Sequence, residues 1–153
     1  MTFAISKTLA LGAVALILAT GAATAGPMDD AVAARQACMK ANGKAMGTYV
    51  PIMKGEAAFD AKAVADAVAA TEAACAGWAG WWNAGMEKGE TLPSRAKPEI
   101  WTDAAGFAAA GEAYGKALGA VKAAADEAAF KTAFPALGAA CQGCHEKFQA
   151  PQG

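Results

Sequence analysis

The sequence between Phe130 and Phe148, FKTAFPALGAACQGCHEKF, decides the fold. Its apolar residues and cysteines recur every three or four positions, a spacing that places them on one face of an α-helix. We therefore expect a helix over about 126–149 with one buried face. Pro135 interrupts this pattern, so we expect it either to kink the helix or to lie in the first turn of a helix that begins later. The expected buried positions are Phe130, Phe134, Leu137, Cys141, Cys144 and Phe148.

Three further segments show the same periodicity. We predict helices over about 28–48, 60–87 and 99–124, because alanine and straight-chain residues dominate these segments. A segment rich in Gly and Pro, 89–98, separates the second helix from the third. Four amphipathic helices in two hairpins predict an all-α, antiparallel four-helix bundle. The expected inward stripes are Val32, Gln36, Met39, Gly43 and Met46; then Val64, Val68, Thr71, Cys75, Trp78 and Trp82; then Phe107, Ala110, Gly111, Tyr114, Leu118 and Val121.

The segment Cys141-Gln142-Gly143-Cys144-His145 is the C-x-x-C-H motif by which c-type cytochromes hold haem. Helix positions i, i+3 and i+4 lie on one face, so both thiols can reach the two vinyl groups of one porphyrin while the imidazole reaches the iron. We predict one haem c, bound covalently through Cys141 and Cys144 near the C-terminus and ligated by His145.

Two other sites share the C-x-x-C core. A thioredoxin-like redox pair would need a βαβ context, which an all-helical chain lacks. A zinc site would need Cys38 and Cys75 to converge on Cys141 and Cys144.

Composition excludes several further classes of protein. The chain is 56% hydrophobic and 18% charged, which is too apolar for a disordered protein and typical of one domain. Its net charge of -1 gives no field to gather nucleic acid or an anionic membrane. A single histidine excludes every site that needs two imidazoles. No catalytic triad or phosphate-binding loop is evident, so we do not expect an enzyme.

The first 25 residues are typical of a cleaved signal peptide. Lys7 precedes an apolar run over 9–19, and Ala23-Thr24-Ala25 supplies small residues at the cleavage site. The run is shorter than the roughly 20 residues that span a bilayer, which argues against a membrane anchor. We expect a domain over 26–153 in a bacterial periplasm, where haem attachment of this kind takes place.

The motif lies near the end of a helical chain, whereas small cytochromes c usually carry it near the N-terminus. The chain resembles cytochrome c prime, the four-helix-bundle class of c-type cytochromes. Two segments extend the resemblance: Arg35-Gln36 followed by Met39 matches an R-Q-x-x-[LM] signature, and KPEIW at 97–101 matches the lead into the third helix.

The resemblance implies roles for three polar residues. Arg35 and Gln36 would reach the haem propionates, and Arg95, in the loop before the third helix, would be a further propionate partner. Without a haem, we would expect Arg35 to be solvated and Gln36 to lie at a helix interface. The family usually has Arg or Lys four residues after the ligand histidine, where this chain has Gln149. Lys147 and Lys131 are the candidate substitutes.

The sixth position of the iron decides the mechanism. A second histidine does not exist, so methionine, lysine, water and no ligand are the alternatives. The resemblance implies that Met39 packs over the distal face without binding, which leaves a five-coordinate, high-spin haem that binds NO and CO. Related bundle cytochromes instead bind a methionine from the first helix and are low-spin electron carriers. That is the alternative for this chain.

Two cysteines lie outside the motif. Cys38 and Cys75 lie on helices that should be antiparallel neighbours, so they form either a disulfide or two buried free thiols. The sequence does not decide between them.

Trp78, Trp81 and Trp82 are expected mostly in the core or at an interface. Adjacent helical residues point about 100° apart, so either Trp81 or Trp82 should face away from the core. The resemblance implies a homodimer through the first two helices, and an exposed tryptophan would fit such a surface.

Three functions follow, in order. The first is reversible binding of NO or CO, with electron transfer to an unknown redox partner as a secondary role. The second is a six-coordinate electron carrier with Met39 as the sixth ligand. The third, from another class, is a haem-free helical protein held by disulfides or zinc.

Overall fold

The computed structural model describes residues 26–151. The expected signal peptide lies outside these residues. Within them the chain is helical and contains no strand, only one isolated bridge between Ala96 and Gln149. No helix among the described residues is long and apolar enough to cross a membrane. The helices are α1 (Pro27–Lys54), α2 (Ala61–Ala74), the 3-10 turn η1 (Trp78–Trp81), α3 (Glu99–Thr102), α4 (Ala104–Lys122) and α5 (Glu127–Phe148).

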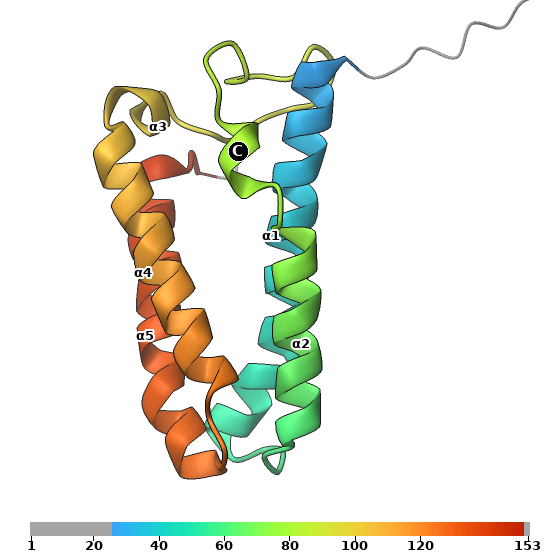
Figure 1. The fold of residues 1–153 in the computed structure, drawn as a ribbon, viewed down its shortest axis with the longest axis vertical. Coiled ribbons are helices and arrows are strands. Elements are labelled where there is room, and N and C mark those ends of the chain that lie inside the picture. Colours follow the sequence, from blue (N-terminus) through green and yellow to red (C-terminus); the bar gives the residue numbers. More distant parts are fainter. Residues whose placement is uncertain (1–25, 152–153) are drawn as a thin grey trace, which may run out of the picture.

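The four long helices form an antiparallel bundle, as predicted. Figure 1 shows α1 beside α2 and α4 beside α5, with the chain between α2 and α4 crossing one end of the bundle. The C-terminal end of α5, which carries the C-x-x-C-H motif, lies at the same end of the bundle as this crossing segment.

The first helix is longer than predicted. It runs six residues beyond Thr48 to Lys54, with Pro51 in its last turn, and ends at Gly55. Gly55 has φ 72°, a left-handed conformation that glycine adopts without steric cost. At the other end Pro27 opens the helix, and Asp29 and Asp30 lie where the macrodipole favours carboxylates.

The second helix is much shorter than predicted. It begins after Asp60, whose side chain caps the backbone N–H groups of Lys62 and Ala63, but it ends at Ala74 instead of 87. Three glycines after this point, Gly77, Gly80 and Gly85, lower the helix propensity by about 1 kcal/mol each. Trp78 and Trp82, which continue the apolar spacing of the predicted helix, therefore lie in η1 and in the loop after it.

The third helix is interrupted and the fourth is continuous. Asp103 leaves the helical conformation, accepts a hydrogen bond from Gly106 N–H and so divides the predicted third helix into α3 and α4. Asp126 caps α5 through Ala129 N–H, and Pro135 lies inside this helix. The prediction of a fourth helix over 126–149 is thus confirmed, and the alternative of a later helix with Pro135 in its first turn is wrong.

Two apolar clusters hold the bundle together. The larger fills the end away from the motif and centres on Tyr49, Phe130 and Leu137, all at most 1% exposed. The smaller comprises Ile100, Phe107 and Phe148 with Trp78, Trp82 and Trp101 packed against it. The predicted inward stripe of the first helix is partly wrong, because Gly43 is exposed while Gln36, Met39 and Met46 are half-buried. The buried residues of α1 are Asp29, Ala31, Val32, Arg35, Cys38, Ala45, Tyr49 and Ile52.

Candidate functional site

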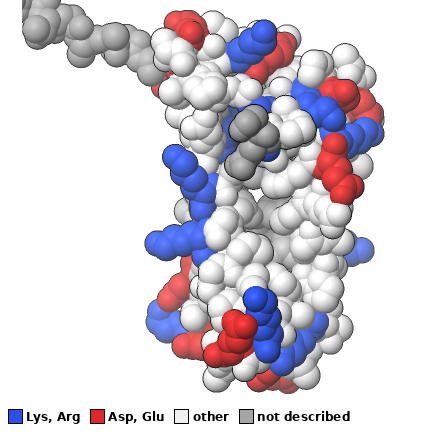
Figure 2. All heavy atoms as spheres, turned by 180° about the vertical axis from the view of Figure 1, so that it is seen from behind, with Lys and Arg blue, Asp and Glu red and all other residues white. Residues whose placement is uncertain are grey.

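Two cavities of about 570 and 880 Å³ lie between α1 and α5. Both volumes fall in the range of roughly 300–1,000 Å³ that is usual for cavities that hold small organic ligands. The face shown in Figure 2 is hollowed between the two sides of the bundle, and Lys and Arg side chains project along one edge. The two cavities share part of their lining, so they form one continuous site: the shared residues are Met39, Trp78, Trp82, Phe107, Cys144 and His145.

The C-x-x-C-H motif lies on the wall that α5 contributes. Cys141 lines the larger cavity, whereas Cys144 and His145 line both. Both cysteines are free and half-buried, and this burial raises the pKa of each thiol above its ordinary value. The structure thus brings together the three side chains that the sequence predicts for haem attachment.

The imidazole of His145 keeps an exposed face but is partly shielded by the cavity walls. This partial desolvation, and then the positive charge of Arg95, lower the pKa of His145. A neutral imidazole has a free nitrogen lone pair, which is the form that binds a metal.

Arg35 is 6% exposed and lines the smaller cavity from α1. Its Nε donates to the carbonyl of Ala31 at 3.2 Å, and its Nη2 donates to the carbonyl of Met86. Its guanidinium carbon lies 4.6 Å from the centroid of the Trp82 ring. Nη1 is buried without a hydrogen-bond partner, although a buried donor normally has one. Arg35 therefore places a buried cation with one unused donor in the wall of this cavity.

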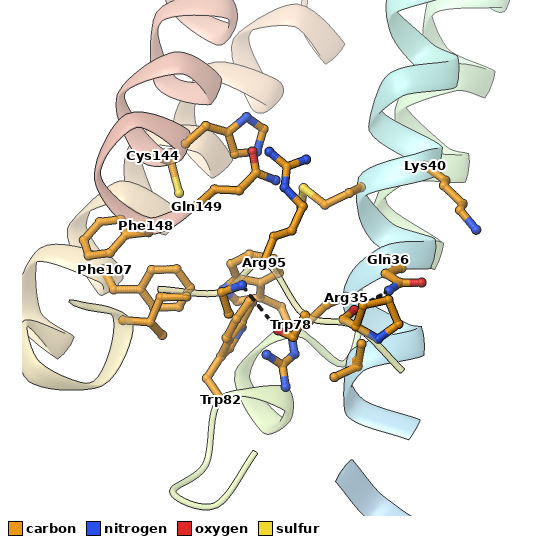
Figure 3. A pocket seen from close by; sticks show the side chains of 17 residues that line it. Arg35, Gln36, Lys40, Trp78, Trp82, Arg95, Phe107, Cys144, Phe148 and Gln149 are labelled. Carbon is orange, nitrogen blue, oxygen red and sulfur yellow. Dashed lines mark hydrogen bonds between the residues drawn. The ribbon is translucent and has the colours of Figure 1, made fainter. Parts of the chain in front are cut away.

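Gln36 is held differently. Its amide nitrogen donates to the carbonyl of Pro93 at 3.0 Å, which ties α1 to the loop before α3. Gln36 also lines the smaller cavity, together with Arg35 and Lys40 (Figure 3).

Arg95 reaches the smaller cavity from the loop before α3. Its guanidinium donates twice to the carbonyl of Ala150, and Ala150 N–H donates to the carbonyl of Arg95 at 2.8 Å. Arg95 and Gln149 lie close to the motif in Figure 3. The cation next to His145 is thus a loop residue, at a position that spacing along α5 does not indicate.

The two lysines proposed as substitutes for that cation lie elsewhere. Lys147 pairs with Asp103, and Lys131 pairs with Glu127 at 2.6 Å. Neither lysine lines a cavity. The prediction that Lys147 or Lys131 replaces the cation missing at position 149 is therefore wrong.

Met39 lies across the site from the motif. It extends from α1, is half-buried and lines both cavities, as do Cys144 and His145 from α5. The structure thus brings Met39 to the same two cavities as His145.

Sequence reasoning missed the aromatic wall of the site. Trp78 and Trp82 were expected mostly as core or interface residues. They do pack against the smaller apolar cluster, but both also line the two cavities. Their ring centroids are 4.8 Å apart, and the Trp82 ring lies 4.8 Å from that of Phe107. The indole N–H of Trp82 is buried without a partner. Three aromatic residues within a bundle of small side chains were the available signal of a flat ligand.

Cys38 and Cys75 form a disulfide with Cα atoms 4.8 Å apart. The alternative of two free thiols is therefore wrong. The bridge also removes both residues from the zinc site considered for four cysteines, and no group of three metal-binding side chains occurs among the described residues.

These residues fit a haem c. Two free thiols and an imidazole share one helix face, aromatic rings flank the cavities, and a buried arginine nitrogen lacks a hydrogen-bond partner. The chemistry of each group suits the part of the cofactor that the motif would bring to it.

Comparison with known proteins agrees with this fit. The family model described as Cytochrome C' matches residues 30–149. A cytochrome c' from Rubrivivax gelatinosus is 34% identical over 123 residues, which cover 78% of this chain and 94% of that protein. A cytochrome c-556 from Agrobacterium tumefaciens is 35% identical over 117 residues, which cover 75% of this chain and 93% of that protein.

The fold is also found in solved structures. One is the nitric oxide complex of a leucine-to-alanine variant of cytochrome c prime from Alcaligenes xylosoxidans. It superposes with a TM-score of 0.71 at 30% sequence identity and covers 82% of this chain and 97% of that chain.

Proposed function

Because this chain belongs to the cytochrome c prime family, we propose that it is a periplasmic c-type cytochrome with one haem c. Cys141 and Cys144 hold the haem covalently and His145 binds its iron. The observation that carries this proposal is the meeting of two free thiols and a partly shielded imidazole at the larger cavity.

The residues of the chain divide the work between binding and shielding. Arg35, Gln36 and Arg95 supply donors to the propionates. Trp78, Trp82 and Phe107 exclude water from the apolar part of the site. When bound, the haem supplies an iron that takes small gases and changes its oxidation state by one electron.

We assign the protein to reversible binding of NO or CO at a five-coordinate iron. Met39, which lines both cavities, would pack against the haem without binding its iron, so that small ligands could reach the iron. A nitric oxide complex is known for a protein of the same fold, which supports this assignment. Electron transfer to an unknown redox partner is a secondary role.

The second candidate is a six-coordinate electron carrier with Met39 as the sixth ligand. The specific observation in its favour is that Met39 lines both cavities from the helix that faces His145. A thioether from this position would convert the iron to a low-spin state.

Visible absorption of the purified protein tests both candidates. The protein is produced in a host that attaches haem c, and the ferric and ferrous spectra are recorded with and without CO. High-spin bands with a Soret shift on CO support the gas-binding proposal. Sharp ferrous bands unmoved by CO support the carrier. A colourless preparation contradicts both, and would favour the haem-free helical protein.

A matched variant tests the attachment. In Cys141→Ser/Cys144→Ser the haem should become extractable with acidified acetone, whereas wild-type haem stays with the protein. Extractable haem in the wild type would contradict covalent binding.

The proposal includes a homodimer formed through α1 and α2, which rests on membership of the cytochrome c prime family. Sedimentation at micromolar concentration tests it, and a monomer at every concentration would contradict it.

A further inference from the structure

The disulfide lies next to the residue that faces His145 across the cavities. Cys38 is 1% exposed and directly precedes Met39 in α1. Adjacent residues of a helix point about 100° apart. Cys38 meets α2 through the bridge and lines only the larger cavity, whereas Met39 lines both cavities. Cys75 is the C-terminal cap of α2. The bridge therefore joins α1 to the end of α2 one residue away from Met39.

Asn42 and Tyr114 extend this junction to a third helix. Asn42, one turn after Cys38, donates from its amide nitrogen to the carbonyl of Cys38 at 2.9 Å. The same nitrogen lies 3.8 and 3.6 Å from the Sγ atoms of Cys38 and Cys75. Its Oδ1 accepts from the hydroxyl of Tyr114 in α4 at 2.6 Å. Helices α1, α2 and α4 thus meet at one polar cluster.

Few large side chains are buried in this part of α1. Between Arg35 and Ala45 the only buried residue of α1 is Cys38. Several of its neighbours are alanine or glycine, which give the helix few large side chains to interlock with α2 or α5. The covalent bridge and the Asn42 bonds therefore restrain how this turn sits against α2 and α4.

We propose that the Cys38–Cys75 bridge, with Asn42 and Tyr114, positions Met39 at the cofactor site and thereby sets access to the distal side. This inference rests on the haem-binding function proposed above. Cys38, Cys75, Asn42 and Tyr114 all line the larger cavity. In this proposal they are positioning residues, whose effect on the iron passes through Met39.

Small rotations are sufficient for this effect. A side-chain tip lies about 6 Å from the helix axis, so a rotation of about 15° moves it by about 1.6 Å. A displacement of that size at a ligand-binding site changes rates substantially.

The first test removes the bridge in the haem-loaded protein. In Cys38→Ala/Cys75→Ala the rate constant for CO association should rise about tenfold, equivalent to ~1.4 kcal/mol of barrier. The CO association rate should also rise if Met39 binds the iron, because a less restrained methionine would dissociate from the iron more easily. The ferric absorption spectrum supplies a second readout. Asn42→Ala and Tyr114→Phe should shift the CO rate the same way by a smaller factor, and they keep the bridge.

A double-mutant cycle separates positioning from general loosening. In a Met39→Ala background, removal of the bridge should leave the CO rate unchanged, because no methionine remains to be positioned. If the bridge merely tightens the bundle, its removal will accelerate CO binding in both backgrounds.

Val64→Ala is the matched control. Val64 is 2% exposed in α2, belongs to the larger apolar cluster and lines neither cavity. This variant should lower the melting temperature without changing the CO rate. If wild-type protein carries haem but neither Cys38→Ala/Cys75→Ala nor Tyr114→Phe alters CO binding, the positioning role is overturned. A wild-type protein without haem would instead overturn the function on which it rests.

Discussion

The guanidinium of Arg95 donates two hydrogen bonds to the carbonyl oxygen of Ala150, at 2.9 Å from Nε and 2.6 Å from Nη2. The chain beyond α5 thereby fixes a loop arginine beside the imidazole of His145. Arg95 supplies a positive charge near His145 without any basic residue at position 149.

Arg95→Ala should raise the pKa of His145 in protein prepared without haem. The substitution removes the positive charge that disfavours the imidazolium, while the larger cause, desolvation, remains. The pKa should therefore rise but stay below 6.5, its ordinary value. Because the chain has one histidine, a proton NMR titration follows its ring signals without ambiguity. Lys147→Ala is the control, since Lys147 pairs with Asp103 and should leave the pKa of His145 in place. An unmoved pKa in Arg95→Ala would show that the charge does not act on the imidazole.

Met39→Ala should accelerate CO association with the haem-loaded protein by roughly tenfold, equivalent to ~1.4 kcal/mol of barrier. Met39 and His145 both line the two cavities, so shortening the Met39 side chain should widen the space next to His145. Stopped-flow mixing with CO measures the rate. Met46→Ala is the matched control, because Met46 lies on the same helix but lines only the larger cavity. Equal rates in wild type and Met39→Ala would place Met39 away from the ligand path.

The sequence predicts a helix well where its apolar periodicity is unbroken and a capping residue marks its start. The fourth helix differs from its predicted ends by one residue on each side, because the stripe from Phe130 to Phe148 is continuous and Asp126 supplies the cap. The predicted end of the second helix is wrong. Trp78 and Trp82 continue the apolar spacing, but the glycines around them disfavour an α-helix there.

The site divides in the same way. Cys141, Cys144 and His145 follow from local spacing on one helix, so sequence alone places them on one wall. The approach of Arg95 to Ala150 is a contact between a loop and the chain end, mediated by a backbone carbonyl that any residue provides. The Cys38–Cys75 pairing needs the helix register, which composition leaves open.

Removal of the bridge should also cost stability. The disulfide closes a loop with a sequence separation of 37, for which the chain-entropy estimate gives about 3–4 kcal/mol. Chemical denaturation of Cys38→Ala/Cys75→Ala against wild type measures this loss. A thiol assay on denatured, unreduced protein gives an independent check. It should find no reactive thiol when haem is attached and two, from Cys141 and Cys144, when it is absent. Four thiols in the haem-free protein would contradict the bridge.

Asp29→Asn should destabilise the protein at neutral pH but not in acid. The carboxylate of Asp29 accepts hydrogen bonds from the Thr91 hydroxyl at 2.6 Å and from the N–H groups of Thr91 and Leu92, both at 3.0 Å. These bonds, the Thr91 hydroxyl first, lower the pKa of Asp29 below 3.8. A carboxylate whose pKa is lower in the folded state than in the unfolded state stabilises the protein at pH values above its unfolded-state pKa. This stabilisation is lost as the pH falls through the folded-state pKa. The melting temperature of Asp29→Asn should therefore fall below that of wild type at pH 7, and the difference between the two melting temperatures should vanish at a pH well below 3.8.

Asp30→Asn is the matched control. It removes the same charge from the first turn of α1, but Asp30 is exposed, so the fall in melting temperature at pH 7 should be smaller. A gap for Asp29→Asn that persists in strong acid would mean that the charged carboxylate is not what holds this loop to α1.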